Sequence, residues 1–134
     1  VQELLKADIV IIPGSKNTLA DMQHLEKSGL ADAILMMHKK GKSVYGICGG
    51  YQLKGLELND PEHIEGEMEK IRGLGILPVT TTLTNNKKTE QCRFTFLNQT
   101  EENIGYEIHM GITSSADPNP LCLINKSEPD GYSL

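Results

Sequence analysis

Cys48 is the residue of this 134-residue sequence that is best placed for covalent chemistry. It lies at the centre of residues 46–50, Gly-Ile-Cys-Gly-Gly, with a glycine two positions away on each side. This spacing of small residues around a nucleophile is typical of a nucleophile elbow, in which the chain turns sharply from a strand into a helix. The unpaired N–H groups at the start of such a helix favour the reactive thiolate. The alternative is a buried cysteine beside glycines that serve only the close packing of strand and helix.

Two backbone segments are candidates to stabilise an oxyanion formed next to Cys48. The N–H of Gly49 follows the cysteine directly. Residues 13–18, Pro-Gly-Ser-Lys-Asn-Thr, form a predicted turn whose N–H groups point toward the same edge of the sheet, so Gly14 and Ser15 are candidate oxyanion-binding or substrate-binding residues. The alternative is an ordinary loop that ends in a helix cap.

Glu107 and His109 form a further candidate pair. They lie in residues 105–111, Gly-Tyr-Glu-Ile-His-Met-Gly, and share one face if that segment is a strand. They could then act as base and orienting group for Cys48, whereas the alternative is a polar, hydrogen-bonded strand face. No metal site is predicted, because the other histidines lack metal-ligand spacing and the acidic residues 62–69 are best interpreted as a solvated face or loop.

The elements that position these residues follow from the hydrophobic pattern. Residues 7–12 predict a parallel strand buried on both faces, and Thr18 with Asp21 predicts a capping box that opens a helix. The remaining predictions for the first half are an amphipathic helix ending at Gly41, a strand over residues 43–47 that runs into Cys48, and a helix over residues 51–58.

The second half of the sequence is rich in β-forming residues. Strands are predicted around residues 76–84, 92–97, 104–113 and 121–125, with a hairpin turn at residues 85–88, Asn-Asn-Lys-Lys. The order of elements predicts one α/β domain of three layers, with a parallel or mixed sheet, flanking helices, and functional groups at the carboxyl ends of the strands.

Composition excludes several classes of function. The net charge is −5 and the basic residues are scattered, which argues against nucleic-acid binding. No apolar run approaches the roughly 20 residues that a membrane span needs. Cys92 and Cys122 lie in strand-like segments and are predicted core thiols rather than disulfide partners, so we expect a cytoplasmic protein.

Four blocks together resemble the cobyric acid synthase family of glutamine amidotransferases. They occur in order at residues 13–18 with Asp21, 46–52, 73–78 and 105–111. The resemblance implies the triad-type, class I glutamine amidotransferase fold, which is flavodoxin-like. It also implies that Cys48 attacks the side-chain amide of glutamine and that the backbone of Gly14 and Gly49 holds the oxyanion.

The resemblance further implies a synthetase domain that uses ATP and Mg²⁺ to amidate carboxylates of a corrin precursor in cobalamin biosynthesis. Residues 1–134 are then a glutamine amidotransferase domain truncated at its C-terminus, with the N-terminal synthetase domain absent and no cofactor of its own. In the family the catalytic histidine belongs to a Thr-Tyr-x-His-Gly block, which this sequence does not reach, and His109 matches a separate element. The chain is therefore predicted to be nearly inactive alone.

Three other interpretations remain open at this point. The chain resembles, less closely, the glutaminase part of cobyrinic acid a,c-diamide synthase or of a ligase acting on cell-wall precursors. It could also be a non-catalytic α/β module that keeps Cys48 for packing. Selective modification of Cys48 by a glutamine-like electrophile would separate the enzyme from the inert module.

Overall fold

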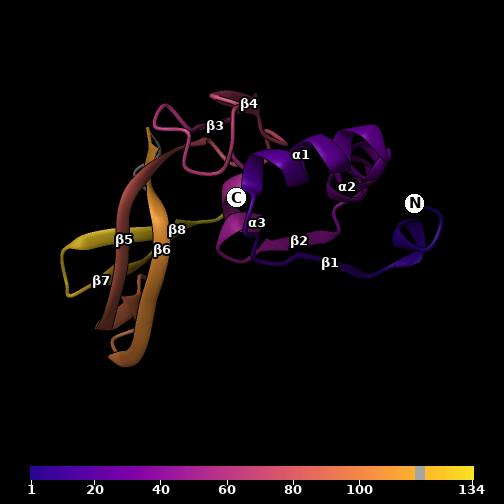
Figure 1. Cartoon of the computed structure of the whole chain (residues 1–134). Helices are drawn as coiled ribbons and strands as arrows, with labels where there is room; N and C mark the ends of the chain where they lie inside the picture. The colour runs from indigo at the N-terminus through magenta and orange to yellow at the C-terminus, as the bar shows by residue number, and fades with distance from the viewer. Residues whose placement is uncertain (117–119) are drawn as a thin grey trace.

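The computed structural model describes residues 1–116 and 120–134, and Figure 1 shows two lobes joined through a short helix. The elements, in chain order, are a 3-10 helix at Leu4–Lys6, β1 (Ile9–Ile12), α1 (Thr18–Lys27), α2 (Leu30–Lys39), β2 (Ser43–Gly46), α3 (Gly49–Leu53), β3 (Glu57–Asn59), β4 (Lys70–Arg72), β5 (Val79–Phe96), β6 (Asn103–Ser115), β7 (Pro120–Ile124) and β8 (Glu128–Tyr132).

The N-terminal lobe is a parallel strand pair covered by two helices. β1 and β2 pair from Ile9 opposite Ser43 to Ile12 opposite Gly46, and α1 and α2 lie on one side of them (Figure 1). The predicted order of strand, two helices and strand is confirmed. The prediction that β1 is buried on both faces is wrong, because both helices cover the same face and leave Ile9 and Ile11 55% and 61% exposed.

The C-terminal lobe is a mixed sheet. Its strand order is β4-β3-β5-β7-β8, with β6 pairing β5 along the other edge. β3 runs parallel to β5, and the remaining pairs are antiparallel. The predicted α/β class, with mixed pairing and flanking helices, is confirmed.

Residues 85–88 do not form the predicted hairpin turn. They lie inside β5, which pairs with β6 on both sides of a register shift between Thr82 and Lys87. Gly111 of β6 adopts φ 94° beside this shift, a conformation that favours glycine and is common at β-bulges. The polar residues are therefore accommodated by an irregularity within a long strand pair.

The helix predicted over residues 51–58 is shorter than expected. α3 ends at Leu53, and Glu57–Asn59 forms β3. Leu58 is fully buried between partners on β4 and β5, so tertiary packing overrides the helical pattern of the sequence.

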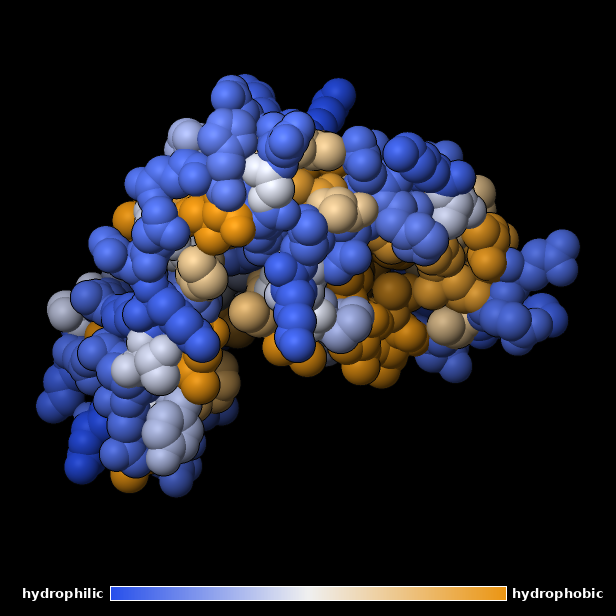
Figure 2. All heavy atoms as spheres, in the orientation of Figure 1, coloured by the Kyte–Doolittle hydropathy of each residue, from blue (hydrophilic) through white to orange (hydrophobic). Residues whose placement is uncertain are grey.

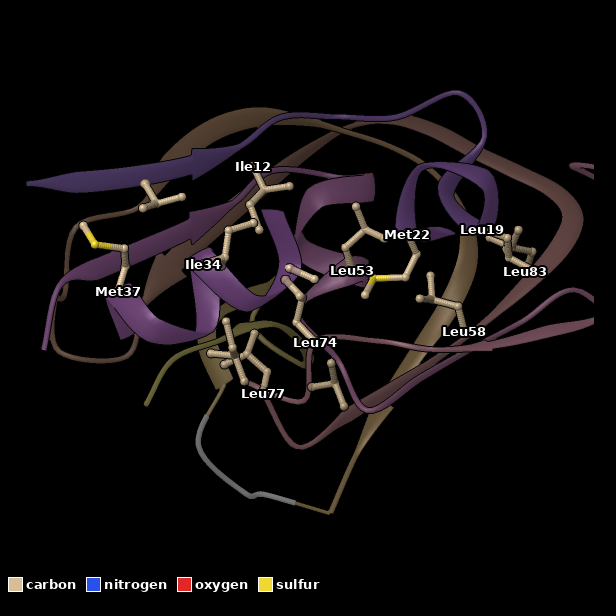
Figure 3. Packing of buried hydrophobic residues seen from close by; sticks show 14 residues of the cluster. Ile12, Leu19, Met22, Ile34, Met37, Leu53, Leu58, Leu74, Leu77 and Leu83 are labelled. Carbon is tan, nitrogen blue, oxygen red and sulfur yellow. The ribbon is translucent and has the colours of Figure 1, made fainter. Parts of the chain in front are cut away.

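One hydrophobic core joins the two lobes. Figure 3 shows side chains from β1, both long helices and α3 packed together with Leu58 of β3 and Leu83 of β5. This shared core fixes α3, and with it the residue that precedes α3, relative to the C-terminal sheet. Among the described residues, no helix has the length and apolar character required to cross a membrane.

Candidate active site

Cys48 connects β2 to α3 in a strained backbone conformation. Its φ of 52° and ψ of −115° lie in a region that residues with a side chain rarely adopt, and it is the N-cap of α3. Ile47 N–H donates to Ile12 O at 3.0 Å, and Gln52 N–H donates to Cys48 O at 3.1 Å, which holds the bend from both sides. The thiol-bearing residue is exposed at this bend. The predicted elbow geometry is therefore present.

The glycines around Cys48 are required by close packing. A Cβ built on Gly46 would lie 2.5 Å from Gly50 O, and one built on Gly50 would lie 2.0 Å from Ile12 O. Real Cβ atoms essentially never come so close to backbone atoms. The strand, the bend and the helix can therefore approach one another only because these positions lack side chains.

The turn after β1 packs directly against the elbow. Gly14 lies beside Cys48, since a Cβ on Gly14 would be 3.7 Å from Cys48 Cβ, and a Cβ on Gly49 would be 2.8 Å from Ser15 N and Cβ. The structure thus brings together Gly14, Ser15, Cys48 and Gly49, which the sequence had singled out separately. The Ser15 hydroxyl donates to Asp21 Oδ2 at 2.5 Å and accepts from Asn17 N–H at 3.0 Å, so it braces the turn.

The start of α1 differs from the predicted capping box. The N-cap is Asn17, whose Oδ1 accepts from Ala20 N–H at 3.1 Å. Thr18 instead donates its N–H to Glu65 Oε2 at 2.5 Å and its hydroxyl to Glu65 Oε1 at 3.2 Å. The reason is that Asp21, the expected capping partner, is already engaged by Ser15.

Glu107 and His109 share a face of β6, as predicted for a strand. His109 Nε2 lies 2.8 Å from Glu107 Oε1, and His109 Nδ1 lies 3.0 Å from Gly111 O. Lys88 Nζ forms an ion pair with Glu107 Oε2 at 2.8 Å. Both ring nitrogens of His109 therefore face oxygen acceptors, so the ring acts as a brace within β6.

The electrostatic balance at Glu107 favours the carboxylate. Burial alone would raise the pKa of Glu107, but the hydrogen bonds and positive charges of Lys88 and His109 outweigh it and hold the pKa below its ordinary value. Hydrogen bonds to Glu107 and to Glu128 raise the pKa of Lys88. Lys88, Glu107 and His109 therefore form a charged cluster on the β5–β6 pair, and Lys88 extends it to Glu128 of β8 at 2.9 Å.

A cleft of about 1130 Å³ lies between the lobes, and Cys48, Glu107 and His109 line it together with Tyr51 and Gln52. Figure 2 shows the hollow between the two halves of the molecule. Residues of β8 line the same cleft, whereas Gly14, Ser15 and Gly49 do not belong to its lining. Cys48 is thus accessible from this cleft, and side chains that can form hydrogen bonds line the cleft beside it.

Cys92 and Cys122 are buried, as predicted for core residues. Burial raises the pKa of the Cys92 thiol, and for Cys122 it raises the pKa to about 11. Both thiols are therefore held in the unreactive protonated form.

Three residues that support the site were not predicted from sequence. Gln52 Nε2 donates to Met110 O at 3.1 Å and ties α3 to β6. Glu65 accepts hydrogen bonds from the first turn of α1, and Asp60 accepts from Ile64 N–H and Glu65 N–H, although residues 62–69 were predicted only as a solvated face or loop. An aspartate followed by proline at the end of a strand favours a side-chain-capped loop, and that was the available signal for Asp60.

The described part of the chain offers no cluster of three or more His, Cys, Asp or Glu side chains arranged to hold a metal ion.

Comparison with known sequences and structures identifies similar proteins. Residues 1–133 match the CobB/CobQ-like glutamine amidotransferase domain family. A protein named cobyric acid synthase from Bacteroides fragilis strain ATCC 25285 is 49% identical over 133 residues, covering 97% of this chain and 27% of the relative. Proteins of the same name from Parabacteroides distasonis and Synechocystis are 48% and 44% identical over 139 and 119 residues, covering 100% and 87% of this chain and 28% and 24% of the relatives.

A solved crystal structure of a glutamine amidotransferase has the same fold. It superposes with a TM-score of 0.66 at 13% identity, covering 90% of this chain and 62% of that one. The chain spans about a quarter of the length of the curated relatives it matches.

Proposed function

The chain belongs to the CobB/CobQ-like glutamine amidotransferase domain family, and we propose that it is the glutamine-hydrolysing part of a cobyric acid synthase. The observation that carries the proposal is the elbow itself. Cys48 is exposed in a strained conformation that close glycine packing maintains, with Gly14 on one side and Gly49 on the other. Strained backbone of this kind clusters at catalytic sites.

In the proposed reaction, the Cys48 thiolate attacks the side-chain carboxamide carbon of glutamine. A carbon–sulfur bond forms, and the carbonyl oxygen becomes an oxyanion that accepts hydrogen bonds from the N–H groups of Gly14 and Gly49. Collapse of this adduct breaks the carbon–nitrogen bond, and the nitrogen takes a proton and leaves as ammonia. Water then hydrolyses the glutamyl thioester to glutamate and restores the thiol.

We infer that His109 is not the general base of this reaction. Each of its ring nitrogens faces an acceptor, at 2.8 Å and 3.0 Å, so it can accept the proton of Cys48 only by giving up one of these contacts. Loss of a general base slows such reactions by roughly 10²-fold or more. We therefore expect slow glutamine turnover by the 134-residue chain.

The wider role follows from the names of the relatives. We propose that the ammonia passes to a synthetase portion that uses ATP and Mg²⁺ to activate corrin carboxylates for amidation. In this scheme glutamine is the ligand of the present chain, and the corrin precursor and the nucleotide bind elsewhere. Neither the corrin precursor nor the nucleotide takes part in the reaction at Cys48.

Selective labelling tests the proposal. A chloroketone analogue of L-glutamine at pH 7.5 is expected to modify Cys48 faster than the analogue of D-glutamine does, and to leave Cys92 and Cys122 intact until urea unfolds the chain. Peptide mass spectrometry identifies the labelled residue, and Cys48→Ser and Cys122→Ser are the paired variants. Equal labelling of the three cysteines, or no preference between enantiomers, would overturn the assignment of Cys48 as a glutamine-directed nucleophile.

A glutaminase assay tests the inference about His109. The residual rate is expected to disappear in Cys48→Ser and to persist within a few-fold in His109→Ala. Steady hydrolysis that His109→Ala abolishes, with the fold retained, would instead make His109 the base.

A further inference from the structure

The segment between β3 and β4 is built around a buried carboxylate. Asp60 is 0% exposed, and its two side-chain oxygens accept from Ile64 N–H and Glu65 N–H, each at 2.8 Å. A buried charge is tolerated only where hydrogen bonds satisfy it. The consequence is a fixed loop in which Glu65 projects in one direction.

Glu65 points at the first turn of α1, which lies beside this loop in Figure 1. Its carboxylate accepts from Thr18 N–H and from the Thr18 hydroxyl, and its backbone carbonyl accepts from Asn17 Nδ2 at 2.9 Å. Leu19 N–H lies 3.4 Å from the same carboxylate. A negative charge is stabilised at this end of a helix by the free N–H groups and the helix dipole.

The need to cap α1 does not by itself account for the contacts that Glu65 makes. Asn17 already caps α1 through its contact with Ala20 N–H. The additional contacts from Glu65 fix residues 17 and 18, which continue directly from the turn that contains Gly14 and Ser15. That turn packs on Cys48 and Gly49. A Cβ built on Gly14 would lie 3.7 Å from Cys48 Cβ, and a Cβ built on Gly49 would lie 2.8 Å from Ser15 N. Glu65 is therefore linked to the elbow through one short stretch of backbone.

We propose that Glu65, oriented by the buried Asp60, is a positioning residue that holds the Gly14 turn at the distance from Cys48 that oxyanion binding requires. The inference rests on the proposed function, because the turn matters only if Gly14 N–H stabilises an oxyanion. Glu65 acts through α1 and the turn. Small displacements of an oxyanion donor weaken transition-state binding steeply, while the fold persists.

The loop provides a matched control. Glu67 is exposed on the same segment, and its carboxylate forms no hydrogen bond or ion pair with the described residues. Glu65→Gln and Glu67→Gln each remove one negative charge without changing side-chain size, so they differ in the contacts that the Glu65 carboxylate makes with Thr18 and Leu19.

The experiment compares two electrophiles on the 134-residue chain. The chloroketone analogue of L-glutamine places a carbonyl oxygen where the oxyanion forms, whereas iodoacetamide alkylates the thiol without that interaction. Glu65→Gln is expected to lower the chloroketone rate constant at Cys48 on the order of tenfold and to leave the iodoacetamide rate within about twofold. Glu67→Gln is expected to change neither rate.

Amide hydrogen exchange gives a readout that does not depend on reactivity. Glu65→Gln is expected to accelerate exchange at residues 14–19 while exchange in β5 and β6 stays unchanged. Thr18→Val removes only the hydroxyl contact with Glu65 and is expected to shift both measurements in the same direction by less, which keeps the test available if Glu65→Gln does not fold.

Different results would contradict the proposed function of Cys48 and the proposed role of Glu65. Loss of enantiomer preference in the wild-type chain would overturn the glutamine-directed function. If that preference is present, equal slowing of both electrophiles in Glu65→Gln, or unchanged exchange at residues 14–19, would overturn the positioning role of Glu65.

Discussion

Cys48 has a backbone conformation whose cost the surrounding residues must offset. A non-glycine residue in such a region is strained by about 1–3 kcal/mol, and it persists only where neighbouring contacts leave the chain no alternative. Here those contacts are the hydrogen bond from Ile47 to Ile12 and the close approach of Gly50 to the end of β1. The conformation of the elbow therefore depends on the packing of the residues around Cys48.

Alanine at Gly50 and at Gly14 should separate packing from chemistry. Gly50→Ala places a methyl carbon 2.0 Å from Ile12 O and is expected to lower the free energy of unfolding by about 3 kcal/mol or more. Gly14→Ala places its methyl in ordinary contact with Cys48, at 3.7 Å, so it should change stability by less than about 1 kcal/mol but slow chloroketone labelling of Cys48. Urea denaturation and labelling rates measure both effects.

A Gly50→Ala variant as stable as the wild type would show that the elbow backbone moves freely, and would contradict the packing argument. Equal labelling of Gly14→Ala and wild type would show that Gly14 does not border the reacting position.

At the scale of elements, local residue types predicted the elbow correctly and the turn at residues 85–88 wrongly. The elbow was predictable because its determinants are neighbours in sequence: two glycines and a cysteine at fixed spacing. The turn at residues 85–88 was predicted wrongly, because asparagine and lysine favour turns locally, but here all four residues lie within β5 and Lys87 and Lys88 pair with β6 beside Gly111. Long-range pairing overrides such preferences.

The charged cluster on the β5–β6 pair gives a pH-dependent prediction. Lys88→Met leaves the largely buried Glu107 side chain with His109 as its remaining charged partner and also removes the ion pair with the more exposed Glu128, so we expect the free energy of unfolding at pH 7 to fall by about 1–3 kcal/mol. The pKa of Glu107 is lowered in the folded state, so its contribution is present above its ordinary pKa of 4.5 and is lost as pH falls through the folded value. The difference between variant and wild type should therefore shrink as the pH is lowered below about 4.5.

Lys87→Met is the control, because Lys87 is the exposed neighbour of Lys88 and loses the same charge. Urea denaturation of the three proteins between pH 3 and pH 7 measures the effect. A pH-independent loss in Lys88→Met, or an equal loss in Lys87→Met, would mean that the ion pair with Glu107 does not contribute.

At the scale of the whole molecule, the site depends on contacts that sequence patterns do not encode. Glu65 contacts a helix 47 residues earlier in the chain, and Gln52 contacts a strand 58 residues later. Neither residue stands in a recognisable local motif for these contacts. The elbow geometry at Cys48 was therefore predictable from sequence, whereas the side chains that hold its surroundings required the fold.

The outer face of the β1–β2 pair leads to a prediction about association. Ile11 is paired with Tyr45, and together with Ile9 these side chains are 55–61% exposed, because no described segment packs on this face. Contiguous exposed apolar surface promotes association, whereas single exposed apolar residues are ordinary. Ile11→Lys is therefore expected to reduce concentration-dependent light scattering of the 134-residue chain and to change the free energy of unfolding by less than about 1 kcal/mol. Met36→Lys on α2 adds the same charge away from this face and should leave the scattering unchanged; equal effects of the two substitutions would mean that net charge, and not the strand face, controls association.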